Sequence, residues 1–451
     1  MITFQRLIFG MKNYIFRPKA VSAYKAALRN EGLSKEELNR LCWEKRVQLI
    51  QYAYDHIPFY KKYYDENGFD PSTLKSESDW DRIPPLEKMH VRHHSDEMVN
   101  PDIPSSCLSY TTTGGSTGLP LKVGRDRRFH LEIVAWRFFR WWGISYADNT
   151  AITHRRVPSN MKELIKNRLL WWPTKRIYLS ATSMTDDKIA SFVREIEKKN
   201  IVWITGYAGA LERIADYVLC NDIKLTTLKM VWSTSAPLTD ITRHKMENAF
   251  GCKVMNQYGC CEVSHIATQC RHSEHMHINC DFVHVDVVDS RNHSLLNEEG
   301  DILVTDLNNF AFPLIKYRLG DRGCLLSETC SCGLPFPLMK SVKGRISDAI
   351  YTPSGVYVDG NYLTTIFDNY SEYIDQFQII QHKDYSICVK YKKKHTAPSD
   401  LNDVIMKIRD ILSKNVNKEI PVFFEEVQQI EHDNGKIRYI KSEIALMKYN
   451  K

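Results

Sequence analysis

The sequence predicts an α/β protein. A large N-terminal domain, residues 1–345, holds mainly parallel sheets, and a small α+β domain, residues 346–451, follows it. Residues 201–207 form an apolar run that ends in a turn, and helical spacing follows from Ala210 to Leu219. Residues 229–237 repeat the pattern of a strand followed by a loop. Strands that alternate with helices are typical of parallel sheets, which bind ligands beyond the carboxyl ends of their strands.

The remaining elements extend this prediction in both directions. Residues 1 to about 100 are expected to be a helical accessory region, because Ser34 and Glu37 form a capping-box pattern before apolar residues at helical spacing. Residues 128–142 are predicted to form a helix rich in aromatics. In the small domain, 385–391 and 421–427 are predicted strands, and 400–412 is a predicted amphipathic helix.

Composition limits the classes of partner. The 451 residues include 61 basic and 54 acidic side chains, for a net charge of +7. This mild excess suits anionic ligands such as ATP or coenzyme A, whereas nucleic-acid binding usually needs a concentrated basic stripe. No apolar window is long enough for a membrane span, and no export signal precedes the chain. The twelve cysteines are therefore expected to be reduced, in a cytoplasmic protein.

Two partner questions stay open at this point. The basic and aromatic residues from Met1 to Arg17 could touch a membrane surface as a peripheral contact. Packing of this segment on the core as an ordinary helix is the favoured interpretation. The sequence also leaves open whether the protein forms a homodimer.

A run rich in glycine and hydroxyl side chains, between Tyr110 and Lys122, is the stretch that best predicts chemistry. Its members are Thr112, Thr113, Gly114, Gly115, Ser116, Thr117 and Gly118. Glycines allow close approach to a ligand, and successive backbone N–H groups form a nest for anions. Lys122 adds a charge nearby. No Gly-Lys-Ser/Thr closes the run, so it is not a Walker A loop; a plain flexible loop has the same composition.

Five further strings follow this run in order. They are Ser233-Thr-Ser-Ala-Pro237, Asn256-Gln-Tyr-Gly-Cys-Cys-Glu262, Tyr317-Arg-Leu-Gly-Asp321, Gly344-Arg-Ile-Ser-Asp348 and Asn434-Gly-Lys436. Together the six strings resemble the motifs of the adenylate-forming superfamily of acyl- and aryl-CoA ligases. The segment around Trp80-Asp-Arg-Ile-Pro-Pro resembles the phenylacetate-CoA ligase family and its capsular-polysaccharide-biosynthesis branch. The resemblance implies a large AMP-binding domain and a small, mobile C-terminal domain that carries a catalytic lysine loop.

The resemblance also implies roles for individual residues. Lys436, Glu262 and Arg345 are the catalytic candidates, with Glu262 as the ligand of Mg²⁺ on the phosphates. Asp321 would accept from the ribose hydroxyls, and Arg318 could hold the acid or a phosphate. The other nucleotide-binding candidates are the phosphate run with Lys122, and Ser235, Ala236, Pro237, Tyr258, Gly259 and Cys261.

The string of residues 256–262 departs from the family pattern at one position. Cys261 stands where the family usually has threonine, and a thiol is a weaker donor than a hydroxyl. The contact that this position usually makes with the α-phosphate is therefore in doubt.

A cluster of cysteines and histidines is independent of these motifs. Cys270, His277, Cys330 and Cys332 are the chosen ligands of a structural zinc ion, since a Cys-x-Cys-Gly knuckle with a distant Cys/His group resembles a tetrahedral site. Some members of the resembled branch hold zinc between these two segments. His272 and His275 are rivals for the histidine position, and surface histidines beside reduced thiols are the alternative interpretation.

The sequence therefore predicts an AMP-forming acid–CoA ligase. It would activate a carboxylic acid, aryl or arylacetic by resemblance, as an acyl-adenylate with ATP and Mg²⁺, and pass the acyl group to coenzyme A. Two alternatives remain: amide formation on an amine or amino-sugar acceptor in surface polysaccharide biosynthesis, and a non-catalytic nucleotide-binding homologue.

Overall fold

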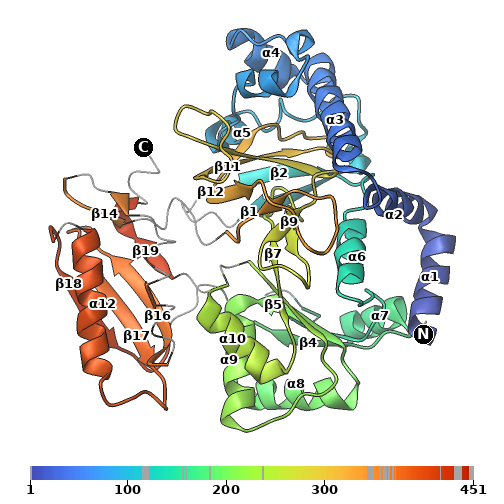
Figure 1. Ribbon diagram of the computed structural model, residues 1–451. Coiled ribbons are helices and arrows are strands. Elements are labelled where there is room, and N and C mark those ends of the chain that lie inside the picture. The colour runs from blue at the N-terminus through green and yellow to red at the C-terminus, as the bar shows by residue number, and fades with distance from the viewer. Residues whose placement is uncertain are drawn as a thin grey trace. The chain divides into compact units, whose positions relative to one another are not determined.

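The computed structural model, shown in Figure 1, divides into two compact units. Unit 1 comprises Met1–Asp148 and Met255–Val342, and unit 2 comprises Asn149–Val254 and Lys343–Lys451. The structure describes residues 3–113, 121–154, 157–158, 160–181, 184–235, 238–342, 350–354, 357–358, 363, 366–367, 370, 372–416, 418–430 and 439–445. The predicted border at residue 345 lies outside these ranges, so it stays a prediction.

Unit 1 begins with the helical region expected from the sequence. Its helices are α1 (Phe4–Phe16), α2 (Pro18–Asn30), α3 (Lys35–His56), α4 (Pro58–Glu66), α5 (Lys88–His93) and α6 (Glu132–Trp141), with short 3₁₀ turns at Pro71–Thr73, Glu77–Arg82 and Ser105–Cys107. The predicted capping box is confirmed: Glu37 N donates to Ser34 Oγ at 3.1 Å, and Ser34 N donates to Glu37 Oε2 at 2.8 Å. These two bonds satisfy N–H groups that a helix start leaves unpaired.

The strands of unit 1 are antiparallel. A hairpin joins β1 (Leu108–Thr113) to β2 (Leu121–Asp126). Seven more strands lie in the order β10-β11-β12-β13-β9-β8-β7. They are β7 (Val254–Tyr258), β8 (Ala267–Gln269), β9 (Met276–Ile278), β10 (Val283–Val288), β11 (Glu299–Asp306), β12 (Tyr317–Leu326) and β13 (Leu338–Met339). Their buried side chains share one apolar core with α3 and α4.

Unit 2 contains the parallel sheet that the sequence predicts. Strands β3 (Thr150–His154), β4 (Arg176–Ser180), β5 (Trp203–Tyr207) and β6 (Met230–Thr234) lie in the order β6-β5-β3-β4 with parallel pairing throughout. Helices α7 (Met161–Trp171), α8 (Asp186–Lys198), α9 (Ala208–Cys220) and α10 (Asp240–Phe250) connect or follow them. In Figure 1, α8, α9 and α10 flank these strands, and their apolar faces form the core.

The C-terminal part of unit 2 is α+β, as predicted. Strands β16 (Ile374–Gln381), β17 (Ile387–Lys393), β18 (Val422–Glu426) and β19 (Ile440–Ser442) lie in the order β18-β17-β16-β19, and β14 (Ile350–Tyr351) pairs with β15 (Tyr357–Val358). Helix α12 (Leu401–Asn415) runs along this sheet in Figure 1. It buries Val404, Ile408 and Leu412 at helical spacing in the core of the sheet.

A buried ion cluster joins the C-terminal sheet to helices α9 and α10 within unit 2. Lys245 Nζ lies 2.9 Å from Glu212 Oε1 and 3.2 Å from Asp216 Oδ1, and it also pairs with Asp375 at the start of β16. Lys392 Nζ lies 2.9 Å from the second oxygen of Asp375. Burial would lower the pKa of Lys245, but the three carboxylates outweigh it and raise that pKa.

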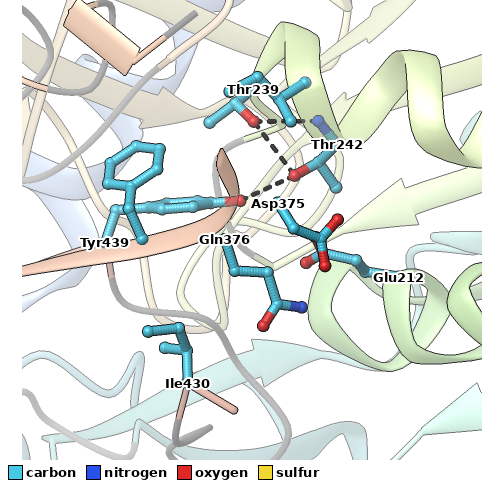
Figure 2. A pocket seen from close by; sticks show the side chains of 9 residues that line it. Glu212, Thr239, Thr242, Asp375, Gln376, Ile430 and Tyr439 are labelled. Carbon is cyan, nitrogen blue, oxygen red and sulfur yellow. Dashed lines mark hydrogen bonds between the residues drawn. The ribbon is translucent and has the colours of Figure 1, made fainter. Parts of the chain in front are cut away.

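A hydrogen bond lies beside this cluster, as Figure 2 shows. Tyr439 Oη and Thr242 Oγ1 are 3.1 Å apart, and Thr239 Oγ1 donates to the same Thr242 hydroxyl at 3.1 Å. Burial raises the pKa of the Tyr439 phenol, which keeps it protonated as a donor. Two separate contacts, one ionic and one neutral, therefore connect α10 to strand β16 and to Tyr439, the residue before β19.

Candidate nucleotide site and metal centre

The predicted phosphate run connects the strands of a hairpin. Thr113 is paired with Leu121, and Thr112 with Lys122, so the two ends of the run lie opposite each other. Gly114, Gly115, Ser116, Thr117 and Gly118 lie outside the described residues. Lys122 Nζ lies 3.9 Å from the centre of the Tyr110 ring, a cation–π contact that places its charge beside β1.

Two predicted nucleotide-binding residues from distant motifs meet in unit 1. Tyr258 ends β7 and Asp321 lies within β12; the Tyr258 hydroxyl donates to Asp321 Oδ2 at 2.8 Å. An ionised carboxylate can accept from several donors at once, which is the property that a ribose partner needs. The expected partner of a ribose and the expected partner of an adenine are thus adjacent.

The turn after Tyr258 places the predicted magnesium ligand. A Cβ atom on Gly259 would lie 1.6 Å from the carbonyl oxygen of Ser264, so only glycine fits where the turn folds back on itself. Glu262 is buried in this turn, at 8 % exposure. Cys261 is exposed, and its carbonyl oxygen accepts from Arg125 Nη2 at 2.5 Å. The position that departs from the family pattern is thus held to β2 through its backbone.

Glu262 lines a cavity of about 60 Å³ within unit 1. Its polar lining includes Arg125, His265, Asp306 and Asn309, and its apolar lining includes Phe129 and Phe282. Burial lowers the pKa of His265 to about 4, so its imidazole is neutral at pH 7. Burial raises the pKa of Asp306 to about 6.

Sequence reasoning did not find Arg125 or Asp306. They belong to strands β2 and β11, outside every motif string, and only the tertiary fold brings them to Glu262.

Arg318, which the resemblance implied as a holder of the acid or a phosphate, contacts protein groups in this structure. Its Nε donates to Glu87 Oε1 at 2.8 Å and its Nη1 to Asp301 Oδ2 at 2.7 Å. It also bonds Asn292. The guanidinium is engaged by these protein groups and ties β12 to β11 and to the start of α5.

The residues predicted as a zinc site come together in unit 1. One ligand atom from each of Cys270, His277, Cys330 and Cys332 lies within 4.8 Å of the other three. Cys270 Sγ is 3.6 Å from Cys330 Sγ, and Cys332 Sγ is 3.3 Å from His277 Nε2. His277 Nδ1 faces the carbonyl oxygen of Phe336 at 3.4 Å, which directs Nε2 toward the thiols. Three sulfur atoms and one imidazole form the donor set of a closed tetrahedral zinc site.

The rival histidines, His272 and His275, do not belong to this group of ligand atoms. His275 Nε2 is 3.2 Å from Glu328 Oε1 at the surface, and the backbone N–H of His272 donates to Cys270 Sγ at 3.4 Å. The geometry therefore favours His277 as the fourth ligand.

The motifs of unit 2 are only partly described. Ser235 is exposed and has a φ of 73°, a left-handed conformation that is uncommon for a serine. Ala236, Pro237, Arg345 and Lys436 lie outside the described residues. Their expected roles stay predictions.

Comparisons with known proteins agree with this arrangement. The CapK C-terminal domain family matches residues 350–443. A phenylacetate-coenzyme A ligase of Thermus thermophilus is 24% identical over 368 residues, which cover 78% of this chain and 80% of the relative. Protein CapK of Staphylococcus aureus is 24% identical over 466 residues, which cover 96% of this chain and 95% of the relative.

A solved structure is similar over most of the chain. A 2-hydroxyisobutyryl-CoA ligase, captured in its postadenylation state, matches with a TM-score of 0.74 at 18% identity, over 94% of this chain and 93% of that one. At this identity the likeness establishes the fold. The chain is therefore a homologue of the phenylacetate-CoA ligases and of CapK, with the fold of the adenylate-forming superfamily.

Proposed function

We propose that this protein is an AMP-forming acid–CoA ligase. It binds ATP, activates a carboxylic acid as an acyl-adenylate and transfers the acyl group to coenzyme A. Relatives named phenylacetate-coenzyme A ligase and the fold shared with another CoA ligase support the reaction class. The same relatives favour an aryl or arylacetic acid as the substrate.

The observation that carries the proposal is the adjacency of Tyr258, Asp321 and the Glu262 turn. Tyr258 and Asp321 are 63 positions apart, yet the Tyr258 hydroxyl bonds Asp321 directly. Glu262 lies four residues beyond Tyr258, in a turn that only glycine permits at position 259. A stacking ring, a hydroxyl acceptor and a carboxylate are the groups needed for adenine, ribose and a phosphate-bound cation.

The chemistry explains why these groups are needed. A carboxylate oxygen of the acid attacks the α-phosphorus of ATP, and the bond to the β-phosphate oxygen breaks, releasing pyrophosphate. The coenzyme A thiolate then attacks the acyl carbonyl, and AMP leaves. Negative charges meet in the first step, so positioning and electrostatic stabilisation supply most of the catalysis. Bound Mg²⁺ would neutralise phosphate charge, and Glu262 is its proposed protein ligand.

Acid-dependent exchange of radioactive pyrophosphate into ATP tests the first half of this proposal. The panel would include aryl, arylacetic, fatty and amino acids, with Lys436→Ala as the variant. Loss of one preorganised donor typically lowers the rate about 10²–10³-fold, so the exchange rate of Lys436→Ala should fall by about that factor. Measurable ATP binding with no exchange for any acid would instead favour a non-catalytic nucleotide-binding homologue.

The acceptor is the second question, and the comparisons give one reason to test an amine. Similarity to CapK extends over 96% of the chain, against 78% for the Thermus ligase, and the C-terminal domain matches the CapK family. The alternative proposal, which rests on the resemblance to the capsular-polysaccharide-biosynthesis branch, is adenylation followed by amide formation on an amine or amino sugar. Mass spectrometry of the product, with coenzyme A and amino sugars supplied together, separates a thioester from an amide.

We also propose a structural zinc ion at Cys270, His277, Cys330 and Cys332. The ligand distances and the burial of the cluster support it. Four protein ligands leave no open coordination position, so the ion would tie the β8–β9 hairpin to the β12–β13 connection and take no part in catalysis. Because β8 pairs with β7 next to Tyr258, the zinc site would brace one strand of the nucleotide site.

A further inference from the structure

Helix α1 presents its apolar side to solvent. Phe4, Leu7, Met11, Tyr14 and Ile15 recur at helical spacing and are 62, 54, 52, 69 and 63 % exposed. These five side chains, called the outer stripe below, fall within one face of the helix. A surface helix of a globular protein normally packs such an apolar face against the core. In α1 this face is exposed to solvent instead.

The inner side of α1 is fixed to unit 1 by polar and aromatic contacts. Arg6 donates to both carboxylate oxygens of Asp148, at 2.8 and 2.6 Å. The Phe9 ring lies edge-on to Trp136 at 5.6 Å, and Asn13 is buried. Since these contacts hold the inner side, the outward direction of the stripe is a property of the folded unit.

The charge of the chain is concentrated at the same place. Residues 1–30 contain six basic side chains and no acidic one, a net charge of +6 out of +7 for the whole chain. Arg6 and Arg17 pair with Asp148 and Glu132. Lys19, Lys25 and Arg29 on α2 are exposed directly after the stripe.

We propose that the outer stripe of α1 docks on the surface of an anionic phospholipid bilayer. The apolar side chains would enter the headgroup–acyl boundary, and the basic residues of α1 and α2 would pair with lipid phosphates. No helix among the described residues is long and apolar enough to cross a membrane. The contact is therefore peripheral.

Charge complementarity selects a bilayer over a second copy of the chain. A symmetric dimer through this stripe would bring the exposed Lys19, Lys25 and Arg29 of one copy toward those of the other, and like charges repel. An anionic membrane satisfies the apolar and the basic groups at once. This inference does not rest on the ligase proposal, because lipid binding can be measured without ATP or an acid.

Sedimentation of the full chain with vesicles tests the proposal. Vesicles of phosphatidylglycerol and phosphatidylcholine should bind the protein, vesicles of phosphatidylcholine alone should not, and added salt should weaken binding. Leu7→Gln, Met11→Gln and Ile15→Gln together should reduce binding at least tenfold. Replacing Lys19, Lys25 and Arg29 with glutamine should reduce it about a hundredfold, since each cation near an anionic surface contributes about fivefold.

A matched variant controls for general loss of apolar surface. Leu296→Gln, Met406→Gln and Phe423→Gln replace side chains that are 56, 62 and 57 % exposed elsewhere, and they should leave lipid binding unchanged. Unchanged melting temperatures would show that all three variants fold. Failure of the wild-type protein to bind anionic vesicles, or equal binding by the stripe variant, would overturn the proposal. Self-association in sedimentation velocity without lipid, lost in the stripe variant, would assign the stripe to a second copy instead.

Discussion

At the residue scale, the bond between Tyr258 and Asp321 links two motifs of the nucleotide site. Tyr258→Phe keeps the ring and removes only the hydroxyl donor at 2.8 Å. A hydrogen bond to a charged group is worth about 1.5–3 kcal/mol, so kcat/KM for ATP should fall about 10–100-fold if the bond positions Asp321 for a ribose. Initial rates at varied ATP measure this, and most of the loss should be in KM.

The chain offers a matched control for this substitution. The Tyr54 hydroxyl donates to Asp65 Oδ1 at the same 2.8 Å, but on the surface of the helical region. Tyr54→Phe should leave the kinetics unchanged. An equal effect of both variants would mean that Tyr258 acts through general stability, and the nucleotide assignment would lose its support.

Asp306 predicts a pH dependence of stability. Burial beside Asp126 raises its folded-state pKa to about 6 from 3.8, although a backbone hydrogen bond from Asn308 and the charge of Arg125 oppose the rise. Below about pH 4 the carboxyl is protonated in both states, and its folded form carries no charge penalty. As the pH rises from about 4 to 6, the carboxyl ionises in the unfolded state but stays protonated in the folded state, so stability falls over this range. Above pH 6 the cost stays constant.

Asp306→Asn should therefore stabilise the fold at pH 7 by at most about 3 kcal/mol and make no difference near pH 4. Urea unfolding at several pH values measures the difference in free energy. Asp289→Asn is the control with the opposite sign, because hydrogen bonds from the His293 and Arg291 backbone lower the pKa of Asp289. A pH-independent effect of Asp306→Asn would contradict the burial argument.

At the scale of elements, the four proposed zinc ligands connect segments that hydrogen bonds alone join weakly. Strand β13 has only two residues, and its Leu338 pairs with His277 of β9. Structural zinc can contribute on the order of 10 kcal/mol to folding. Chelation or Cys330→Ser should therefore lower the melting temperature markedly, and elemental analysis should find about one zinc per chain.

Cys220→Ser is the control for the loss of a thiol, because Cys220 is exposed at the end of α9 in the other unit. It should change neither the zinc content nor the melting temperature. Metal-free protein that melts at the same temperature as the purified protein would show that the cluster is only a group of reduced thiols.

Elements with local signals were predicted well from the sequence. The capping box of α3 was found because Ser34 and Glu37 lie three residues apart, and the parallel sheet was found because each strand precedes its helix. The choice of His277 depended on resemblance, and the geometry agrees with it. The antiparallel order of β7 to β13 was not predicted. Strands β8, β9 and β13 have only two or three residues and carry little periodicity, and the pairing of the longer strands depends on tertiary contacts.

Contacts between residues that are distant in the sequence could not be predicted, because no local pattern indicates them. Lys245 pairs with carboxylates from positions 212, 216 and 375. No sequence feature near Lys245 predicts the pairing with position 375. The outer stripe of α1 was likewise ambiguous, because apolar residues at helical spacing look the same whether they face a core or solvent. Only the packing of Phe9 and Asn13 on the other side decides the direction.

At the scale of the whole molecule, the contacts of α10 with the C-terminal sheet bear on the two half-reactions. Lys436, the predicted catalytic lysine, precedes Tyr439 by three residues, and three residues reach at most about 10 Å. Whatever holds Tyr439 therefore limits where Lys436 can act. Tyr439 bonds Thr242, as Figure 2 shows. Asp375 pairs with Lys245 in the same arrangement of unit 2.

If that arrangement serves adenylation, weakening it should affect the two half-reactions differently. Tyr439→Phe removes one hydrogen bond, worth about 1 kcal/mol or fivefold in population, and leaves Thr242 its partner Thr239. Pyrophosphate exchange should slow by up to about that factor, while transfer from a pre-formed acyl-adenylate to coenzyme A is unchanged or faster. The string of residues 344–348 resembles the hinge between the large and small domains of the superfamily. Asp348→Pro, which would stiffen this segment, should do the opposite: it should spare exchange and impair transfer. Rapid-quench measurement of each half-reaction separates these outcomes. If both variants slowed adenylation and transfer equally, the contacts would only stabilise the fold. The C-terminal domain would then keep the same contacts with α10 in both steps.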